Sequence, residues 1–174
     1  MNLKKTVLIL AATTTGLSAG LFFGFQVSVI PAFMTLSNAE YIAAMQAINI
    51  AILNPIFMLT FLGPAILLPV AAYPYRSAPA SLQFILLVAA ALLYIVGSLG
   101  ITMGANVPLN DALAQFSLHS STPAQAATAR AVFEDPWNNW HMIRTLASIG
   151  SLVLVIIVCL SPSSIRSSQS KQKN

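Results

Sequence analysis

The sequence contains few charged residues. Only 12 of its 174 side chains are Lys, Arg, Asp or Glu, which is 7% of the chain and well below the roughly 25% of an average soluble domain. The charges leave uncharged stretches at residues 6–39, 41–75, 77–110 and 145–165. About 20 apolar residues in a helix cross the hydrocarbon core of a bilayer. The scarcity of charge therefore excludes an ordinary soluble domain and predicts four membrane-spanning helices.

Cysteine and histidine are also scarce. The single Cys159 excludes an internal disulfide framework and a site built from several thiolates. His119 and His141 are 22 residues apart, a spacing typical neither of a zinc site nor of paired haem ligands. The basic residues lie at the ends of the apolar stretches, which indicates membrane topology rather than nucleic-acid binding. We therefore expect no metal, no cofactor and no nucleic-acid partner.

The apolar stretches predict an all-α fold, a polytopic four-helix transmembrane bundle with a partly helical outer loop. We expect one membrane domain over residues 1–161 and a disordered cytoplasmic tail over 162–174. The first stretch is too long for the apolar region of about 7 to 15 residues in a secretory signal, so we expect it to be a retained span. The spans are predicted at about 7–31, 50–73, 81–103 and 141–161, with the outer loop at 104–140.

Three local patterns refine this prediction. Within the outer loop, residues 117–129 are typical of a mobile linker, and Thr122–Pro123 is a possible helix start. Asp135–Pro136 has the N-cap and first-turn proline expected where the fourth helix begins. Small residues that recur every four positions favour close helix packing, so we expect the glycine face of the third span to pack against that of the first. These faces contain Gly97, Gly100 and Gly104, and Gly16, Gly20 and Gly24.

The distribution of charge predicts the orientation. With four spans, six basic residues fall on the side of the chain termini: Lys4, Lys5, Arg76, Arg166, Lys171 and Lys173. All four acidic residues fall on the other side: Glu40, Asp111, Glu134 and Asp135. Cytoplasmic loops carry an excess of Lys and Arg. We therefore expect an integral protein, of the plasma (inner) membrane, with both termini in the cytoplasm.

Arg144 is the one charged residue well inside a predicted span. An ionisable side chain at that depth usually faces the bundle interior or a cavity. Arg144 shares one helix face with Trp137, Trp140, His141 and Ser148. Counted from Trp137, the other members of this face, Arg144 included, follow at i+3, i+4, i+7 and i+11. We expect Trp137 in the interfacial belt, whereas Trp140 suits either the belt or the wall of a ring-binding site. His141 is a candidate general base.

Amide side chains form a second polar set. Gln46, Asn49, Asn54, Asn106 and Asn110 all map to the outer half of the protein or its outer surface. Buried amides need partners for their donors and acceptor, which either mutual packing or a ligand can supply. Asn54–Pro55 also predicts a break in the helix.

Four motifs together resemble the anthrone oxygenase-like family of small four-span membrane proteins. They are AMQAIN at residues 44–49, NPIFM at 54–58, NVPLN at 106–110, and Trp140-x-x-x-Arg144-Thr145-Leu146. The resemblance extends from about Gly16 to Ser161, and the last two motifs are its most specific parts. The sequence has His141 where the family usually has Asn after the tryptophan.

The resemblance implies an oxygenase that converts an anthrone to an anthraquinone with molecular oxygen. Such chemistry needs a base, donors for an oxyanion and an apolar slot for flat rings. On this basis His141 or Asp111 would be the base, and Arg144, Asn106 and Asn110 would stabilise the oxyanion. Trp140 would stack on the substrate, and the other substrate-binding candidates are Trp137, Asn49, Asn54 and Gln46.

Three functions remain open at this point. The first is a cofactor-independent oxygenase of an aromatic or quinone-like hydrophobic substrate, within the lipid bilayer. The second is a non-enzymatic protein that binds or moves a small hydrophobic molecule. The third is a structural or accessory membrane subunit.

Overall fold

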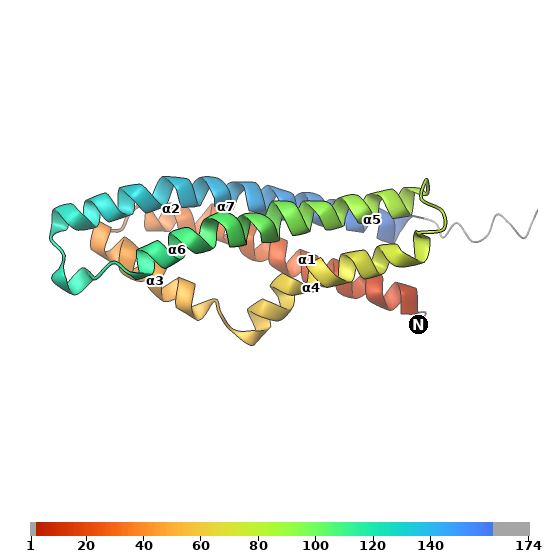
Figure 1. The fold of residues 1–174 in the computed structure, drawn as a ribbon, viewed down its shortest axis with the longest axis horizontal. Coiled ribbons are helices and arrows are strands. Elements are labelled where there is room, and N and C mark those ends of the chain that lie inside the picture. Colours follow the sequence, from red (N-terminus) through yellow and green to blue (C-terminus); the bar gives the residue numbers. More distant parts are fainter. Residues whose placement is uncertain (1–2, 162–174) are drawn as a thin grey trace, which may run out of the picture.

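The computed structural model describes residues 3–161, which fold into a bundle of long helices with no strand in this range (Figure 1). Four helical rods are long and apolar enough to cross a membrane: Leu3–Phe33, Pro55–Tyr75, Leu82–Ala114 and Pro123–Leu160. This confirms the predicted all-α, four-span membrane bundle. The predicted tail at 162–174 lies outside the described residues.

Several of the rods change helix type along their length. The elements are α1 (Leu3–Gly24), η1 (Phe25–Val29), α2 (Ile30–Phe33), α3 (Asn38–Ala51), α4 (Pro55–Ala72), η2 (Tyr73–Tyr75), α5 (Leu82–Leu92), η3 (Leu93–Gly100), η4 (Thr102–Asn106), α6 (Val107–Ala114), η5 (Leu118–Ser120) and α7 (Pro123–Leu160). Three of them, η1, η3 and η4, are π-helical. Such wide turns are rare in helices and frequently occur at functional sites.

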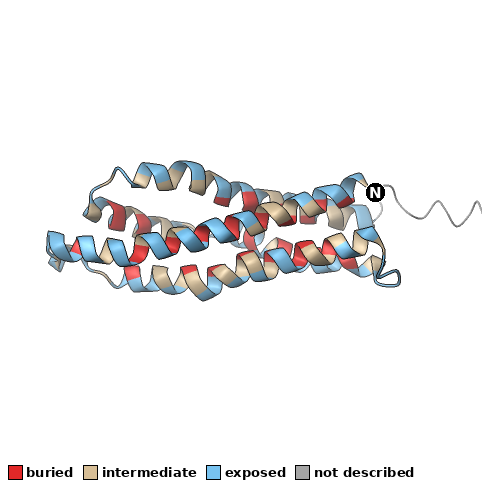
Figure 2. Cartoon of the chain, turned by 90° about the horizontal axis from the view of Figure 1, so that it is seen from above, coloured by how far each residue is buried: buried red, intermediate tan, exposed pale blue. Residues whose placement is uncertain are grey.

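The rods run up and down the bundle, so Leu3 and Leu160 lie at the same end, which we call the terminal end (Figure 1). The opposite end, the distal end, contains α3, α6 and the start of α7. Helix α1 packs against α4 and α7, and α5 packs against the same two helices. Buried residues follow the inner faces of the rods along the bundle (Figure 2).

The exposed side chains of α7 locate the membrane boundary at the distal side. Asp135 and Asn139 are exposed and polar, whereas the exposed side chains that follow Trp140 are apolar. From Trp140 to Leu160 the helix rises about 30 Å, which matches the thickness of a hydrocarbon core. Helix α3 and the first turns of α7 therefore extend beyond the hydrocarbon core at the distal end.

Much of the segment predicted as an outer loop is helical, and the predicted linker is wrong from Pro123 onward. Thr122 caps α7 through a capping box with Gln125, so the fourth helix begins there rather than at Asp135. Pro136 lies inside this helix. Asp-Pro is a common helix start, but Ala126 and Phe133 are buried on the face of α7 that also buries Trp137. Their tertiary packing continues the helix through the proline.

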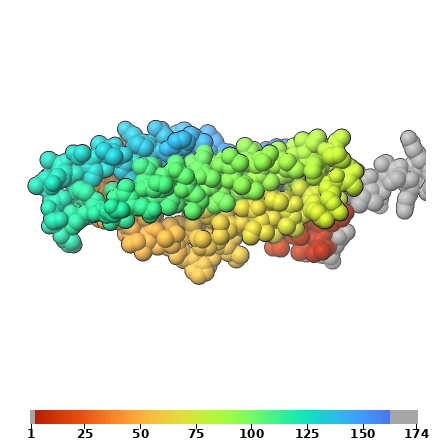
Figure 3. Space-filling view, in the orientation of Figure 1, coloured from red at the N-terminus to blue at the C-terminus, as the bar shows by residue number. Residues whose placement is uncertain are grey.

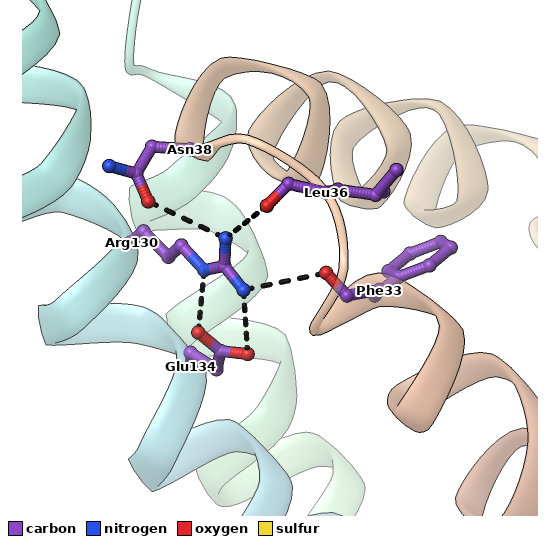
Figure 4. A network of polar contacts seen from close by, with 5 residues as sticks. All are labelled: Phe33, Leu36, Asn38, Arg130 and Glu134. Atoms are coloured by element: carbon purple, nitrogen blue, oxygen red, sulfur yellow. Dashed lines mark hydrogen bonds and ion pairs between the residues drawn. The ribbon is translucent and has the colours of Figure 1, made fainter.

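Arg130 holds the turn between α2 and α3 in place (Figure 4). Its guanidinium donates to the carboxylate of Glu134 at 2.6 Å and to the carbonyl oxygen of Leu36 at 2.8 Å. It also donates to Asn38 Oδ1 and the Phe33 carbonyl, each at 3.4 Å. Leu36 lies in the turn itself, and Phe33 is the last residue of α2. Arg130 therefore fastens the distal part of α7 to the α2–α3 turn.

Helix α3 begins at a second capping box, formed by Ser37 and Glu40. The hydroxyl and backbone N–H of Ser37 donate to the Glu40 carboxylate, and these bonds lower the pKa of Glu40. Helices α3 and α4 then meet at an elbow around Asn54–Pro55, which protrudes from the side of the bundle (Figure 3). Exposed apolar side chains at the elbow include Ile50, Leu53 and Ile56.

The expected packing of the third span against the first is wrong. A Cβ atom added to Gly97 would lie 2.7 Å from Cβ of Ala147 on α7, and one added to Gly20 or Gly24 would meet nothing within 4 Å. A face of small residues lets another helix approach closely but does not determine which helix that is. The close glycine contact of the third span is therefore with the fourth.

We expect Gly97→Ala to destabilise the bundle by about 1–3 kcal/mol, because the added methyl group overpacks a rigid helix contact. Gly104→Ala is the matched control, since a Cβ there meets nothing within 4 Å. Thermal unfolding in detergent measures both variants. Equal melting temperatures for the two would show that the helices separate freely at Gly97.

Candidate functional site

The candidate site surrounds Arg144 in α7. Arg144 lies four residues beyond Trp140, which places it about 6 Å inside the distal membrane boundary. Its side chain is only 8% exposed. The guanidinium is therefore withdrawn into the bundle, as its position in the sequence predicted.

Polar neighbours hold the guanidinium from two sides. Its Nε and Nη2 atoms lie 3.1 and 2.9 Å from Nδ1 of His141, and its Nη1 donates to Oγ1 of Thr102 at 3.1 Å. The charge also lies over the rings of Phe22, at 4.5 Å, and Trp137, at 5.2 Å. Within residues 3–161, the one salt bridge joins Arg130 to Glu134. Arg144 thus has hydrogen-bond acceptors and aromatic faces around it but no carboxylate.

The contacts of His141 determine its proton arrangement. Because Arg144 has only donors, Nδ1 of His141 must be the acceptor, and the ring proton lies on Nε2. That nitrogen faces the carbonyl oxygen of Phe22 at 3.1 Å. Both ring nitrogens are therefore engaged, and His141 links the backbone of α1 to the guanidinium.

Aromatic rings form a stack beside this pair. The Trp137 indole lies parallel to the His141 ring, with centroids 4.9 Å apart and planes inclined by 9°. Phe25 lies against both rings, at 5.4 Å from Trp137 and 5.2 Å from His141. We call Phe25, Trp137 and His141 the ring stack. Two of its members, Trp137 and His141, contact the Arg144 guanidinium.

The expected belt position of Trp137 is wrong, and the structure decides between the two alternatives for Trp140. Trp137 is 3% exposed and belongs to the ring stack, whereas Trp140 is 41% exposed at the membrane boundary. On a helix of 3.6 residues per turn, Trp137 shares the face of His141 and Arg144, and Trp140 lies about 60° to one side. Trp140 therefore has the position of an interfacial-belt residue.

Two amides of the third rod join the site through Trp137. Asn110 Oδ1 accepts a hydrogen bond from the indole Nε1 at 2.7 Å. Asn106 is 0% exposed, and its Nδ2 donates to the backbone carbonyl of Trp137 at 3.2 Å. The structure thus brings these amides together with Arg144 and His141.

Other predicted site residues have different surroundings. Gln46 donates to the carbonyl oxygens of Leu113, in the last turn of α6, and of Phe116, just after that helix. Asn54 is exposed and caps α4, and Asp111 is exposed on α6. Asn49 is half-buried on α3.

Sequence analysis missed Phe22, Ser98 and Thr102. Thr102 and the buried Ser98 occupy the same stripe as Asn106 and Asn110, in which successive members are four positions apart. Ser148 donates to Ser98 at 2.9 Å, which extends the polar contacts along the bundle axis. The stripe is visible in the sequence as a polar residue every fourth position of an apolar span. The carbonyl of Phe22 leaves no such signal, because any residue has one.

A family model described as anthrone oxygenase matches residues 57–154, which is more than half of the chain. The chain belongs to the anthrone oxygenase family. The matched segment contains Asn106, Asn110, His141 and Arg144, while α3 lies before it. Comparisons with curated proteins and with solved structures gave no match. In residues 3–161 no three His, Cys, Asp or Glu side chains lie together as metal ligands.

The two arginines of α7 should respond differently to substitution. Arg130→Met removes an ion pair and the hydrogen bonds to three further acceptors. We therefore expect it to lower the free energy of unfolding by more than about 1.5 kcal/mol. Arg144→Met removes a charge that has no carboxylate partner, which offsets its lost hydrogen bonds. We expect its melting temperature in detergent to be unchanged or higher. A loss as large as that of Arg130→Met would mean that Arg144 serves the fold.

Proposed function

We propose that this member of the anthrone oxygenase family is a cofactor-independent oxygenase of a flat, hydrophobic aromatic substrate. The observation that carries the proposal is the Arg144 guanidinium, a buried cation at the edge of the bilayer with no carboxylate to neutralise it. An anionic group of a bound substrate would compensate this charge. The ring stack beside it suits a planar molecule that arrives from the membrane.

The proposed reaction begins with transfer of a proton from the acidic methylene of an anthrone to water at the bilayer edge. The resulting negative charge is delocalised onto the ketone oxygen, where donors from Arg144 would stabilise it. The carbanion then adds to oxygen. The peroxide that forms with oxygen takes a proton back before it breaks down to the quinone and water. In the overall balance the methylene loses two hydrogens and gains one oxygen atom, and the second oxygen atom leaves as water. Electrons come from the substrate itself, so the proposal invokes no cofactor.

We assign His141 a positioning role. Both of its ring nitrogens are occupied, and its Nδ1 holds two nitrogens of the guanidinium. This differs from the general base considered from the sequence. Asp111 receives no role, because it is exposed on α6. Asn110 and Asn106 support Trp137, and through it the ring stack.

We further propose a plasma (inner) membrane location with both termini in the cytoplasm. Lys4, Lys5 and Arg76 lie at the terminal end, whereas Glu40 and Asp135 lie at the distal end. This asymmetry is the one that the positive-inside rule describes. In this orientation, the site lies close to the external surface.

The activity proposal is tested by oxygen uptake of the purified protein with anthrone. We expect Arg144→Met to lower turnover about 100-fold or more, as for loss of an oxyanion donor. Arg144→Lys keeps the positive charge, so its turnover should fall less than that of Arg144→Met. Arg76→Met, at the exposed terminal end, is the control and should turn over normally. Unchanged turnover in Arg144→Met would refute the role, and ligand binding without oxygen uptake would favour a non-enzymatic binding protein.

Orientation is tested by cysteine labelling of intact cells with a membrane-impermeant maleimide, in a Cys159→Ser background. Ser120→Cys and Ser77→Cys are a matched pair, because both serines are exposed and lie at opposite ends of the bundle. We expect labelling of Ser120→Cys in intact cells and of Ser77→Cys only after permeabilisation. The reverse pattern would invert the proposed topology.

A further inference from the structure

Three amide side chains each bury a polar atom that has no hydrogen-bond partner among the described residues. These atoms are Oε1 of Gln26, Nδ2 of Asn49 and Oδ1 of Asn106. Buried polar atoms are nearly always paired, because an unpaired one has lost its bonds to water without replacement. Three such atoms in one small protein indicate a missing partner.

Asn106 is the best-defined of the three. Its Nδ2 donates to the carbonyl oxygen of Trp137, and rotating the amide by half a turn would place two oxygens against each other. The Trp137 carbonyl therefore fixes the amide. Because Asn106 is 0% exposed, its Oδ1 is a fixed, buried acceptor that requires a donor.

The other two amides lie on elements that border the ring stack. Gln26 directly follows Phe25, whose ring contacts Trp137 and His141. Asn49 lies one helical turn after Met45, which is buried in the same apolar cluster as Trp137. No hydrogen bond within residues 3–161 orients the amide of Gln26 or Asn49. Each can therefore turn its N–H or its oxygen toward a ligand.

We infer that Gln26, Asn49 and Asn106 form a hydrogen-bonding subsite beside the ring stack, which binds an aromatic ligand through a ring hydroxyl group. A hydroxyl can donate to Asn106 Oδ1 and accept from an amide N–H at the same time. A ketone without hydroxyl groups cannot supply that donor. The inference rests on the proposed function and adds that the substrate is hydroxylated. Ordered water is the other possible occupant.

The test compares binding of 1,8-dihydroxyanthrone with that of unsubstituted anthrone by the full chain in detergent. In a Trp140→Phe background, Trp137 is the remaining tryptophan, so quenching of its fluorescence reports on ligands at the ring stack. Gln26→Met and Asn49→Leu remove amides that bond no described residue. Asn139→Leu removes an exposed amide of α7 and is the matched control.

We expect Gln26→Met and Asn49→Leu each to weaken binding of the dihydroxyanthrone about tenfold, the size expected for one lost hydrogen bond. Their affinity for anthrone and their melting temperatures should not fall. If both amides bind the same hydroxyl group of the ligand, the affinity of the double variant should fall by less than the product of the two single-variant factors. Asn139→Leu should bind both ligands normally.

Equal affinities of all variants for the dihydroxyanthrone would overturn the inference and assign the amides to water. An equal loss for both ligands would also overturn it, because the amides would then act on packing rather than on the hydroxyl. Fluorescence quenching does not depend on turnover. Selective binding without oxygen uptake would therefore refute the oxygenase proposal while supporting this subsite.

Discussion

The burial of one full positive charge among apolar helices is the constraint on which the interior of this protein depends. The Arg144 guanidinium lies inside the bundle, and none of the described carboxylates pairs with it. The groups around it must therefore be hydrogen-bond acceptors or the faces of aromatic rings. His141, Thr102 and the ring of Phe22 supply these contacts. The polar residues Ser98 and Ser148 continue along the same axis. The bundle is thus organised around a polar centre that a membrane protein maintains only at a cost in solvation energy.

The two arginines of α7 show how surroundings determine the role of a residue type. Arg130 meets Glu134 and the carbonyl oxygens at the α2–α3 turn, and its charge is neutralised where the bundle extends beyond the bilayer. Arg144 lies within the hydrocarbon region with its charge uncompensated. The first arrangement strengthens the fold, and the second has a use if an anion is bound.

Much of the architecture could be predicted because a bilayer imposes simple rules on a sequence. Uncharged stretches predicted four spans, and the depth of Arg144 in its span predicted burial. The helical period also placed Trp137, His141 and Arg144 on one face. The predictions at the distal end were weaker. Asp135 and Pro136 have the composition of a helix start, yet the burial of Phe133 and Ala126 continues the helix through them. Local propensity was overridden there by packing that a sequence does not display.

By itself, the sequence determined the fold class, the number of spans and the residue around which a site would form, because hydropathy and charge act residue by residue. The tertiary structure alone decided which neighbours complete that site. It buried Trp137 and left Trp140 at the boundary, engaged both nitrogens of His141, and used Asn54 and Gln46 as helix caps. Among the described residues it also left three buried amide atoms without a hydrogen-bond partner. These outcomes depend on the distances and directions between helices, which one helix's sequence pattern does not specify.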